Sequence, residues 1–269
     1  MCDVGPHIAV WHQHKMLELG AMPSWNIHTA HVERLLREHA AADLGIRDVN
    51  CFLFGNFVPD IYVGYMVPNP TKTIDYRVCH FADPHHMPEP RYQEFWDVHA
   101  EPSRDGKGRV SDVTLGVWAH LVADCLYNHN VNVLVEEQEL EYGDPLRVRK
   151  QGDFDAFGHT LDIGMVPEVT PELLAQCASF PQYEVAEPDV RAAVDVARGI
   201  VRDTQEHHLS HEPEYSLLSS SFFAKVSDLV DNTIANGLLS YANGFAARAE
   251  SDRRADDGPR AESGQDIQN

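Results

Sequence analysis

The sequence has few basic residues and no long apolar run. It has 21 Lys and Arg residues and 42 Asp and Glu residues, which gives a formal net charge of −21. Such an acidic chain repels phosphate backbones, so we expect no nucleic-acid-binding patch, although a bound dication would reverse the charge locally. No apolar run approaches the roughly 18 residues that a transmembrane helix needs, so no transmembrane segment is predicted.

Paired cysteines are also lacking. The five cysteines are widely spaced and include no Cys-x-x-Cys, so neither a disulfide framework nor a thiolate zinc site is expected. The first residues lack a basic segment followed by an apolar one, so no signal peptide is predicted. These features together predict a cytoplasmic protein, and a hydrophobic content of 43% is enough to form a folded core.

Helical periodicity dominates the chain, whereas strand signals are few and short. The clearest element covers residues 111–137, where Ser111 and Asp112 can cap a helix that carries a wide apolar face. We therefore predict an all-α fold. A first helix is expected to begin at Ser24 and to end at Gly45, and a second is expected within residues 50–64 with its end near Pro59. Four more helices are expected over 153–163, 171–178, 188–206 and 216–247.

The pattern divides the chain into three segments. Residues 1–21 follow neither helix nor strand periodicity, so they form a doubtful or disordered arm, or translation starts at Met22. Residues 22–247 form a single all-helical domain. Residues 248–269 contain no large apolar residue except Ile267 and are predicted to be a disordered acidic tail.

Histidine is abundant, with 16 residues, and imidazole is the commonest metal ligand in proteins. The sharpest local pattern is His120-x-x-x-Asp124 within the helix over 111–137, because residues four apart lie on one face of a helix. A buried imidazole and carboxylate need partners. A shared metal ion would satisfy both, and a mutual hydrogen bond is the alternative.

Three weaker candidates lie upstream of this pair. Asp60 follows an apolar run and a proline, where a carboxylate can bind a metal or cap the next segment. His80 stands between apolar residues before a turn, where a core histidine bonded to the backbone is the alternative. His28 opens the first predicted helix, and His31 is the other candidate for its inward-facing position.

The stretches MPSWNIHTA, FLFGNFVPDI, CHFADP and GVWAHLVAD, taken in this order, resemble the zinc-dependent phospholipase C family and, more distantly, the fungal single-strand nucleases. The resemblance covers residues 22–130. It implies an all-α, metal-dependent hydrolase domain of the phospholipase C and nuclease type.

For the site, the resemblance implies that Asp60, His80, His120 and Asp124 form one zinc site. Asp124 would then bridge to a second metal ion, for which His28 is a further ligand. Mixed imidazole and carboxylate donors suit Zn²⁺, and also Mn²⁺ or Fe²⁺.

The chain departs from the family in two respects. Secreted members bind metal through the amino group of an N-terminal Trp, whereas Trp25 lies within this chain. The family also holds a third zinc with a His that follows the helix Asp and with a later His-x-x-x-Glu. His129 is the possible additional ligand after Asp124, and His208 with Glu212 has the later spacing. The resemblance thus implies one to three ions.

The implied activity is hydrolysis of a phosphoester, in which a metal-bound hydroxide attacks phosphorus and Asp60 is both a ligand and the general base. The substrate would be a small phosphoester or a phospholipid head group. Residues 61–67 (IYVGYMV) are a candidate apolar rim for lipid, and burial in the core is the alternative. Lys72 and Arg77 are candidate phosphate contacts, with a solvated loop as the alternative, and His159 is a candidate neighbour of the centre.

Two other classes remain open. One is a metal-binding helical protein of the same fold without hydrolytic activity, acting as a sensor or interaction module. The other is a metal-free helical bundle in which the histidines are structural.

Overall fold

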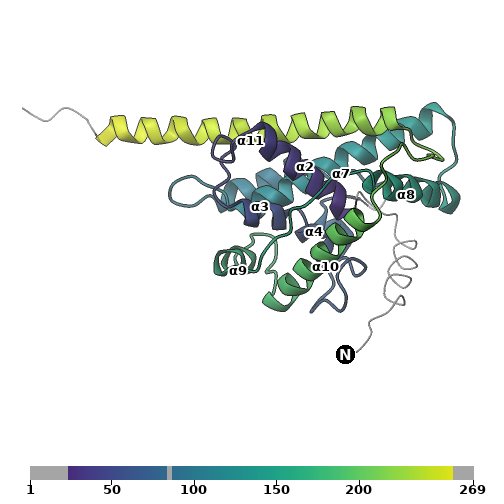
Figure 1. Cartoon of the computed structure of the whole chain (residues 1–269). Coiled ribbons are helices and arrows are strands. Elements are labelled where there is room, and N and C mark those ends of the chain that lie inside the picture. Colours follow the sequence, from purple (N-terminus) through teal and green to yellow (C-terminus); the bar gives the residue numbers. More distant parts are fainter. Residues whose placement is uncertain (1–23, 84–86, 257–269) are drawn as a thin grey trace, which may run out of the picture.

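The computed structural model describes residues 24–83 and 87–256, with side chains described as far as Gly244. Within these ranges the chain forms ten α-helices, one π-helical turn and one 3-10 turn, and no strand, so the predicted all-α class is confirmed (Figure 1). The elements are α2 (Trp25–Glu38), α3 (Val49–Gly55), α4 (Val58–Ile61), α5 (Tyr76–Cys79), α6 (Tyr92–Phe95), η1 (Trp96–Ala100), η2 (Glu101–Ser103), α7 (Asp112–Glu137), α8 (Asp144–Gly158), α9 (Pro171–Ala178), α10 (Glu187–Glu206) and α11 (Ser220–Asp256).

Helix α7 is the central element of the domain. Helices α3, α4, α6, α9 and α11 all contact it. It begins as predicted, because Ser111 is the N-cap and its Oγ accepts a hydrogen bond from the backbone N–H of Thr114 at 3.2 Å. Every residue from 112 to 124 is buried. The polar pair His120 and Asp124 therefore lies in a dry interior, where polar groups are costly unless they are satisfied.

Two glycines let α3 touch α7 backbone to backbone. A Cβ on Gly116 would lie 2.2 Å from the carbonyl oxygen of Phe52, and a Cβ on Gly55 would lie 2.3 Å from the carbonyl oxygen of Val113. Any larger residue would force the helices apart. This contact brings Asn56, the C-cap of α3, next to His120 on α7.

The prediction of one helix over residues 50–64 is wrong. The structure has two helices there, α3 and α4, and the break falls at Asn56 and Phe57. Pro59 lies in the first turn of α4 instead of ending a helix. Proline suits that place because the first helical residues need no N–H donor within the helix.

The predicted end of the first helix is also wrong. Helix α2 ends at Glu38, and Gly45, with a φ of +75°, belongs to a separate turn. Ser24 is the N-cap as expected, but its side chain makes no capping hydrogen bond.

In the second half of the chain, α9 and α10 lie where the sequence predicts them. Helix α8 starts at Asp144, ahead of the predicted residue 153, because Pro145 and an acidic residue suit a first turn. Helix α11 continues to Asp256, so the predicted tail is helical over 248–256. The predicted arm and the rest of the tail lie outside the described residues.

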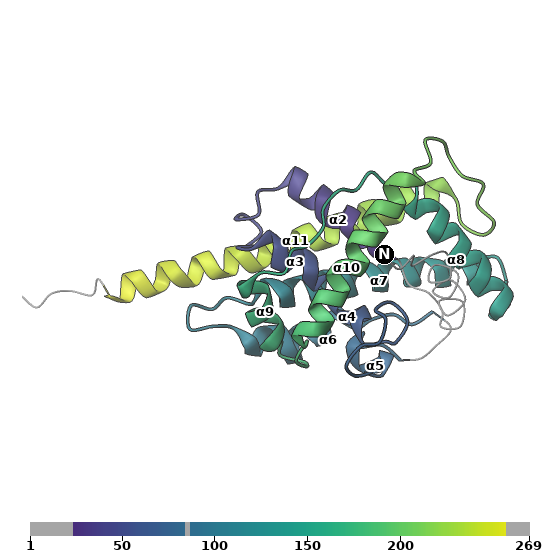
Figure 2. The ribbon, with the colours of Figure 1, turned by 60° about the horizontal axis from the view of Figure 1, so that its bottom comes forward.

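The helices surround α7 unevenly. Helix α11 runs along one side of the domain, and its last turns extend beyond the other helices (Figure 1). Helices α8 and α9 lie at opposite ends, with α10 between them (Figure 2). No described helix combines the length and apolarity that crossing a membrane requires.

Candidate metal centre

The five side chains singled out as ligands converge in the interior. They come from four helices: His28 from α2, Asp60 from α4, His80 from the C-cap of α5, and His120 and Asp124 from α7. Their side chains are between 0% and 4% exposed. The tertiary fold therefore brings together residues that the sequence separates, while their role as ligands stays a prediction.

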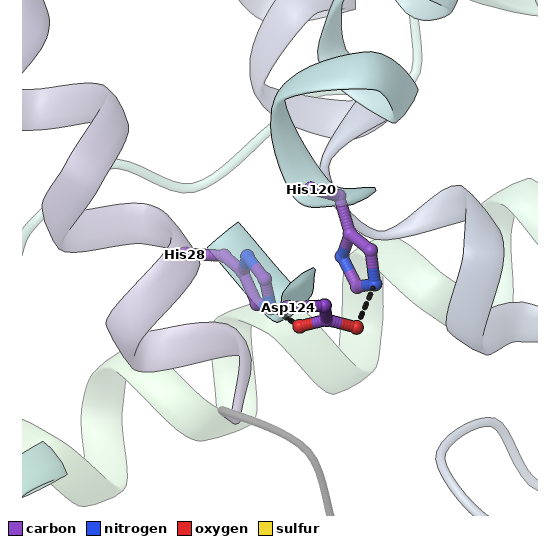
Figure 3. A group of neighbouring side chains, drawn as sticks. All are labelled: His28, His120 and Asp124. Atoms are coloured by element: carbon purple, nitrogen blue, oxygen red, sulfur yellow. Dashed lines mark ion pairs between the residues drawn. The ribbon is translucent and has the colours of Figure 1, made fainter. Parts of the chain in front are cut away.

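The Asp124 carboxylate lies at the middle of the group. Its Oδ1 is 3.3 Å from Nε2 of His28, and its Oδ2 is 3.0 Å from Nε2 of His120 (Figure 3). The same Oδ2 is 3.6 Å from Nε2 of His80. Because its two oxygens face different imidazoles, this carboxylate has the arrangement needed to bridge two cations.

A second trio overlaps the first. Nε2 of His80 lies 3.2 Å from Oδ1 of Asp60 and 3.3 Å from Nε2 of His120. One ligand atom from each of His28, His120 and Asp124, and likewise from each of Asp60, His80 and His120, lies within 4.8 Å of the others. The two trios share His120, but an imidazole nitrogen binds a single ion. Asp124, whose Oδ2 also lies 3.6 Å from Nε2 of His80, is the carboxylate that contacts members of both trios.

Several of these buried atoms have no hydrogen bond although they lie close together. They are both ring nitrogens of His28, Oδ1 of Asp60 and both carboxylate oxygens of Asp124. Leaving a buried polar atom unpaired costs about 1–3 kcal/mol. A cation shared among these atoms would remove that cost, so the donor set fits a bound metal ion, and its mixture of imidazole and carboxylate suits zinc.

Neighbouring groups orient two of the candidate ligands. Nδ1 of His120 lies 2.8 Å from the carbonyl oxygen of Asn56 and donates to it, which leaves Nε2 facing the cluster. Nε1 of Trp25 donates to Oδ2 of Asp60 at 2.8 Å, so that Oδ1 faces His80. Such outer partners are typical of metal sites.

The ring of His80 is held by stacking. The Tyr76 ring lies parallel to it, with 4.0 Å between the ring centroids and 11° between the planes. Tyr76 is only partly buried, so this phenol lies at the edge of the centre.

Charge within the cluster shifts the pKa values of its members. Burial acts to lower the pKa of His120, but the Asp124 and Asp60 carboxylates outweigh it and raise that pKa to about 9. Burial opposes ionisation of Asp124, yet His120 and His28 hold its pKa below the usual value. Burial lowers the pKa of His28, and the charge of His120 lowers it further. A cation would therefore displace a proton from His120 on binding.

Sequence reasoning missed Trp25, Asn56 and Lys150. Lys150 of α8 is 2% exposed, and its Nζ donates to Oδ1 of Asn128, one turn beyond Asp124, at 3.1 Å. Burial lowers the pKa of Lys150 to about 8, while the Asp124 carboxylate opposes that shift. Trp25 could have been found from its helical spacing to His28. Nothing local distinguishes Lys150 from an exposed lysine.

The alternative to His28 is excluded by the structure. His31 points away from the cluster, where its Nδ1 lies 2.6 Å from Oδ1 of Asp231 and its Nε2 lies 3.2 Å from the Tyr127 hydroxyl. Three residues along a helix turn a side chain by about 300°, so the two histidines lie on neighbouring but distinct parts of the helix surface.

The additional zinc ligands do not reach the centre. His129 is 55% exposed, and its Nδ1 lies 3.2 Å from Oε2 of Glu89. His208 and Glu212 are exposed on the segment after α10. His159 does not neighbour the centre either, because it faces Asp203 on α10. Among the described residues, the buried group thus offers candidate ligands for one or two ions, and none of the three additional candidates lies beside it.

Of the two alternatives for residues 61–67, a lipid rim or the core, the structure shows the core. Ile61, Tyr62 and Val67 are at most 1% exposed. The two candidate phosphate contacts bind other groups of the protein. Lys72 donates to the backbone carbonyl of Glu184 at 2.6 Å, and Arg77 pairs with Asp75 at 2.8 Å on the surface.

Comparison of the chain with protein-family models, with curated proteins and with solved structures gives no match. The fold and the cluster define an all-helical protein with buried histidine and aspartate groups that can hold metal ions.

Proposed function

We propose that this protein is a metal-dependent phosphoester hydrolase, with zinc as the metal, and that it resembles the zinc-dependent phospholipase C family in fold and site. The observation that carries the proposal is the Asp124 carboxylate, whose oxygens make no hydrogen bond and face His28 on one side and His120 with His80 on the other. The five candidate ligands on which the resemblance rests, from His28 to Asp124, also lie close together in space.

The donors divide into two groups around Asp124. Asp60, His80, His120 and Asp124 would hold one ion, and His28 with Asp124 would hold a second. A bound dication supplies a water molecule of lowered pKa and neutralises charge on phosphoryl oxygens.

Asp60 has the geometry of a proton acceptor. Its Oδ2 is held by the Trp25 indole, whereas its Oδ1 has no hydrogen bond. Oδ1, which faces His80, would therefore act either as the ligand atom or as the proton acceptor of a general base, and not as both at once. The carboxylate keeps its orientation in either role, because the indole bond does not depend on Oδ1.

A small phosphoester fits this chain better than a lipid surface. The apolar residues of 61–67 that could have met a lipid are buried in the core. Lys150, the only buried Lys or Arg among the described residues, lies close enough to Asp124 to feel its charge. A positive group there favours an anionic ligand over a neutral one.

A second candidate is a metal-binding protein without hydrolytic activity. The burial of all five candidate ligands favours it, because side chains at most 4% exposed present little surface to a substrate. The metal would then stabilise the fold, as structural ions do.

Metal content and activity together test both candidates. Elemental analysis of the full chain, made without a histidine tag, would compare the wild type with His120→Ala/Asp124→Ala and with Asp124→Asn. Asp195→Asn is the matched control, because that carboxylate is 75% exposed. We expect the wild type and the control to hold one or two equivalents of zinc, manganese or iron more than the other two proteins.

Hydrolysis of bis-p-nitrophenyl phosphate by the metal-loaded wild type, lost with the metal in Asp124→Asn, would support the enzyme. Metal without hydrolysis would favour the second candidate. Equal metal in wild type and the double variant would refute the centre, and full metal in Asp124→Asn would refute the bridging role.

A further inference from the structure

A separate group of metal-ligating side chains lies on the surface, where α8 and α10 end. His159 is the C-cap of α8, Asp203 lies in the last turn of α10, and His207 is the C-cap of α10. Their exposed fractions are 29%, 60% and 65%. None of them belongs to the buried centre, so the group stands independently of the function proposed above.

The two imidazoles converge on one carboxylate. Nε2 of His159 lies 3.3 Å from Oδ2 of Asp203, and Nδ1 of His207 lies 3.0 Å from Oδ1 of the same residue. Nδ1 of His207 also donates to the Asp203 carbonyl oxygen at 3.1 Å, so the lone pair of His207 that would bind an ion is on Nε2. One ligand atom from each of the three residues lies within 4.8 Å of the others. This spacing allows a single ion to contact all three.

The backbone holds His159 in a conformation suited to binding a metal. Its Nδ1 lies 2.9 Å from the carbonyl oxygen of Asp155 and donates to it, so the lone pair is on Nε2, the atom that faces Asp203. The same arrangement occurs at His120, whose Nδ1 faces the Asn56 carbonyl. A backbone acceptor behind the ring is the usual second partner of a metal-binding histidine.

Two hydrogen bonds join the segments that carry the ligands. The backbone N–H of Leu209 donates to the carbonyl oxygen of His159 at 2.8 Å. Nε2 of Gln205 donates to the carbonyl oxygen of Ile163 at 2.8 Å. The end of α10 is therefore fixed against the chain that follows α8, and ligand binding does not require the two segments to find each other.

We propose that His159, Asp203 and His207 form a second, solvent-accessible metal site for a borderline dication such as Zn²⁺. Two imidazoles and one carboxylate favour Zn²⁺, Ni²⁺ or Cu²⁺ over Mg²⁺ and Ca²⁺, which prefer oxygen ligands. Three protein ligands on an exposed surface leave a coordination position for water.

An ion at this site links α8 to α10. Helix α10 contacts α2, the helix of His28, and α8 carries Lys150. The surface ion therefore restrains α10, which packs against the helix of His28, and α8, which carries Lys150. It also adds one equivalent to the metal content of the protein, which the buried ligands do not account for.

Zinc binding to the full chain tests the site. Equilibrium dialysis against zinc would compare the wild type with His159→Gln/His207→Gln, and with His208→Gln/His211→Gln as the matched control, because those two histidines are exposed on the same segment. We expect the His159→Gln/His207→Gln protein to bind one equivalent less than the wild type or the control. Equal binding by the wild type and His159→Gln/His207→Gln would overturn the proposal, and so would loss of the equivalent in the control.

A second measurement locates the ion in the wild-type protein itself. Diethyl pyrocarbonate modifies free imidazole, and mass spectrometry can follow each histidine of the wild type. Saturating zinc should slow modification of His159 and His207 at least tenfold, and leave His208 and His211 unprotected. In His120→Ala/Asp124→Ala the same protection should persist, because the two sites share no residue. Unprotected His159 and His207 in the wild type would refute the site.

Discussion

Nε2 of His28 lies 3.3 Å from Oδ1 of Asp124 in an ion pair that lacks the alignment of a hydrogen bond. Both side chains are fully buried. A simple ion pair in an apolar interior would align N–H with oxygen, because a buried charge needs its hydrogen bonds to offset the lost hydration. A ring nitrogen and a carboxylate oxygen that meet at this distance without an aligned hydrogen bond are instead arranged like two ligands of one cation. Four predictions follow from that arrangement and its surroundings.

Removing the metal should destabilise the fold. Without an ion, the unpaired atoms of Asp60 and Asp124 stay buried at a cost. A ligand present at 100 times its Kd stabilises a protein by about 2.7 kcal/mol. Thermal unfolding of the wild type with zinc and with EDTA should therefore differ by several degrees. For His120→Ala/Asp124→Ala the difference should shrink to that of the surface site, and an unchanged difference would contradict the prediction.

Replacing Trp25 should weaken metal binding at the centre. Trp25→Phe keeps an aromatic ring against Phe57, whose ring centroid is 4.5 Å away, but removes the donor to Asp60. Loss of such an outer partner typically costs about 10–100-fold in metal affinity. Competition with a chromophoric chelator would measure the loss. Trp96→Phe is the control, because that indole lies against Trp118 and Tyr241 and not against a candidate ligand. Equal affinities of the two variants would show that the indole bond is unimportant.

The glycine contact between α3 and α7 should tolerate no side chain. In Gly116→Ala the new Cβ would meet the backbone oxygen of Phe52 at 2.2 Å, so the helices must separate. We expect a loss of about 1–3 kcal/mol in the free energy of unfolding, measured with urea. Zinc affinity should fall as well, because Asn56 moves away from His120.

The matched control for this contact is Gly152→Ala. Gly152 lies within α8 and has nothing within 4 Å of the added Cβ. Alanine there should stabilise the protein by about 0.5–1 kcal/mol, since glycine is the poorer helix former. If Gly116→Ala leaves the free energy of unfolding unchanged or raises it, as Gly152→Ala should, the close approach is contradicted.

The buried ammonium of Lys150 should make stability depend on pH. Burial lowers its pKa in the folded protein from 10.5 to about 8. Between these values the unfolded chain binds the proton and the folded chain does not. Stability therefore rises as the pH increases from about 8 to about 10.5. The full effect is about 3 kcal/mol, since each pKa unit corresponds to about 1.4 kcal/mol.

Lys150→Met should lack this rise. Urea unfolding of both proteins in EDTA at pH 7.5 and pH 10 gives the contribution of Lys150 to the free energy of unfolding, because all other titratable groups are common to the two proteins. The wild type should gain stability relative to Lys150→Met on going to pH 10. Lys225→Met, which replaces an exposed lysine of α11, should follow the wild type. A parallel response of the wild type and Lys150→Met would contradict the buried ammonium.

Much of the site could be predicted because its strongest element is local. The His120 and Asp124 pair needs only the pitch of one helix to place both side chains on one face, and the cap at Ser111 predicts where that helix begins. Asp60 and His80 are weak candidates from their local sequence, and the resemblance to the phospholipase C family is what grouped them with His120. Their distances to His120 could not be predicted, because they depend on how separate helices pack.

The sequence by itself determined the all-helical class, the central helix and the candidate ligands that share one of its faces, since these follow from periodicity within one segment. Only the tertiary structure decided between His28 and His31, directed His129 outward, and placed residues 61–67 in the core. Those outcomes depend on contacts between segments far apart in the chain, such as Gly55 against Gly116. Burial of a side chain is set by everything that packs around it, and no local pattern contains that information.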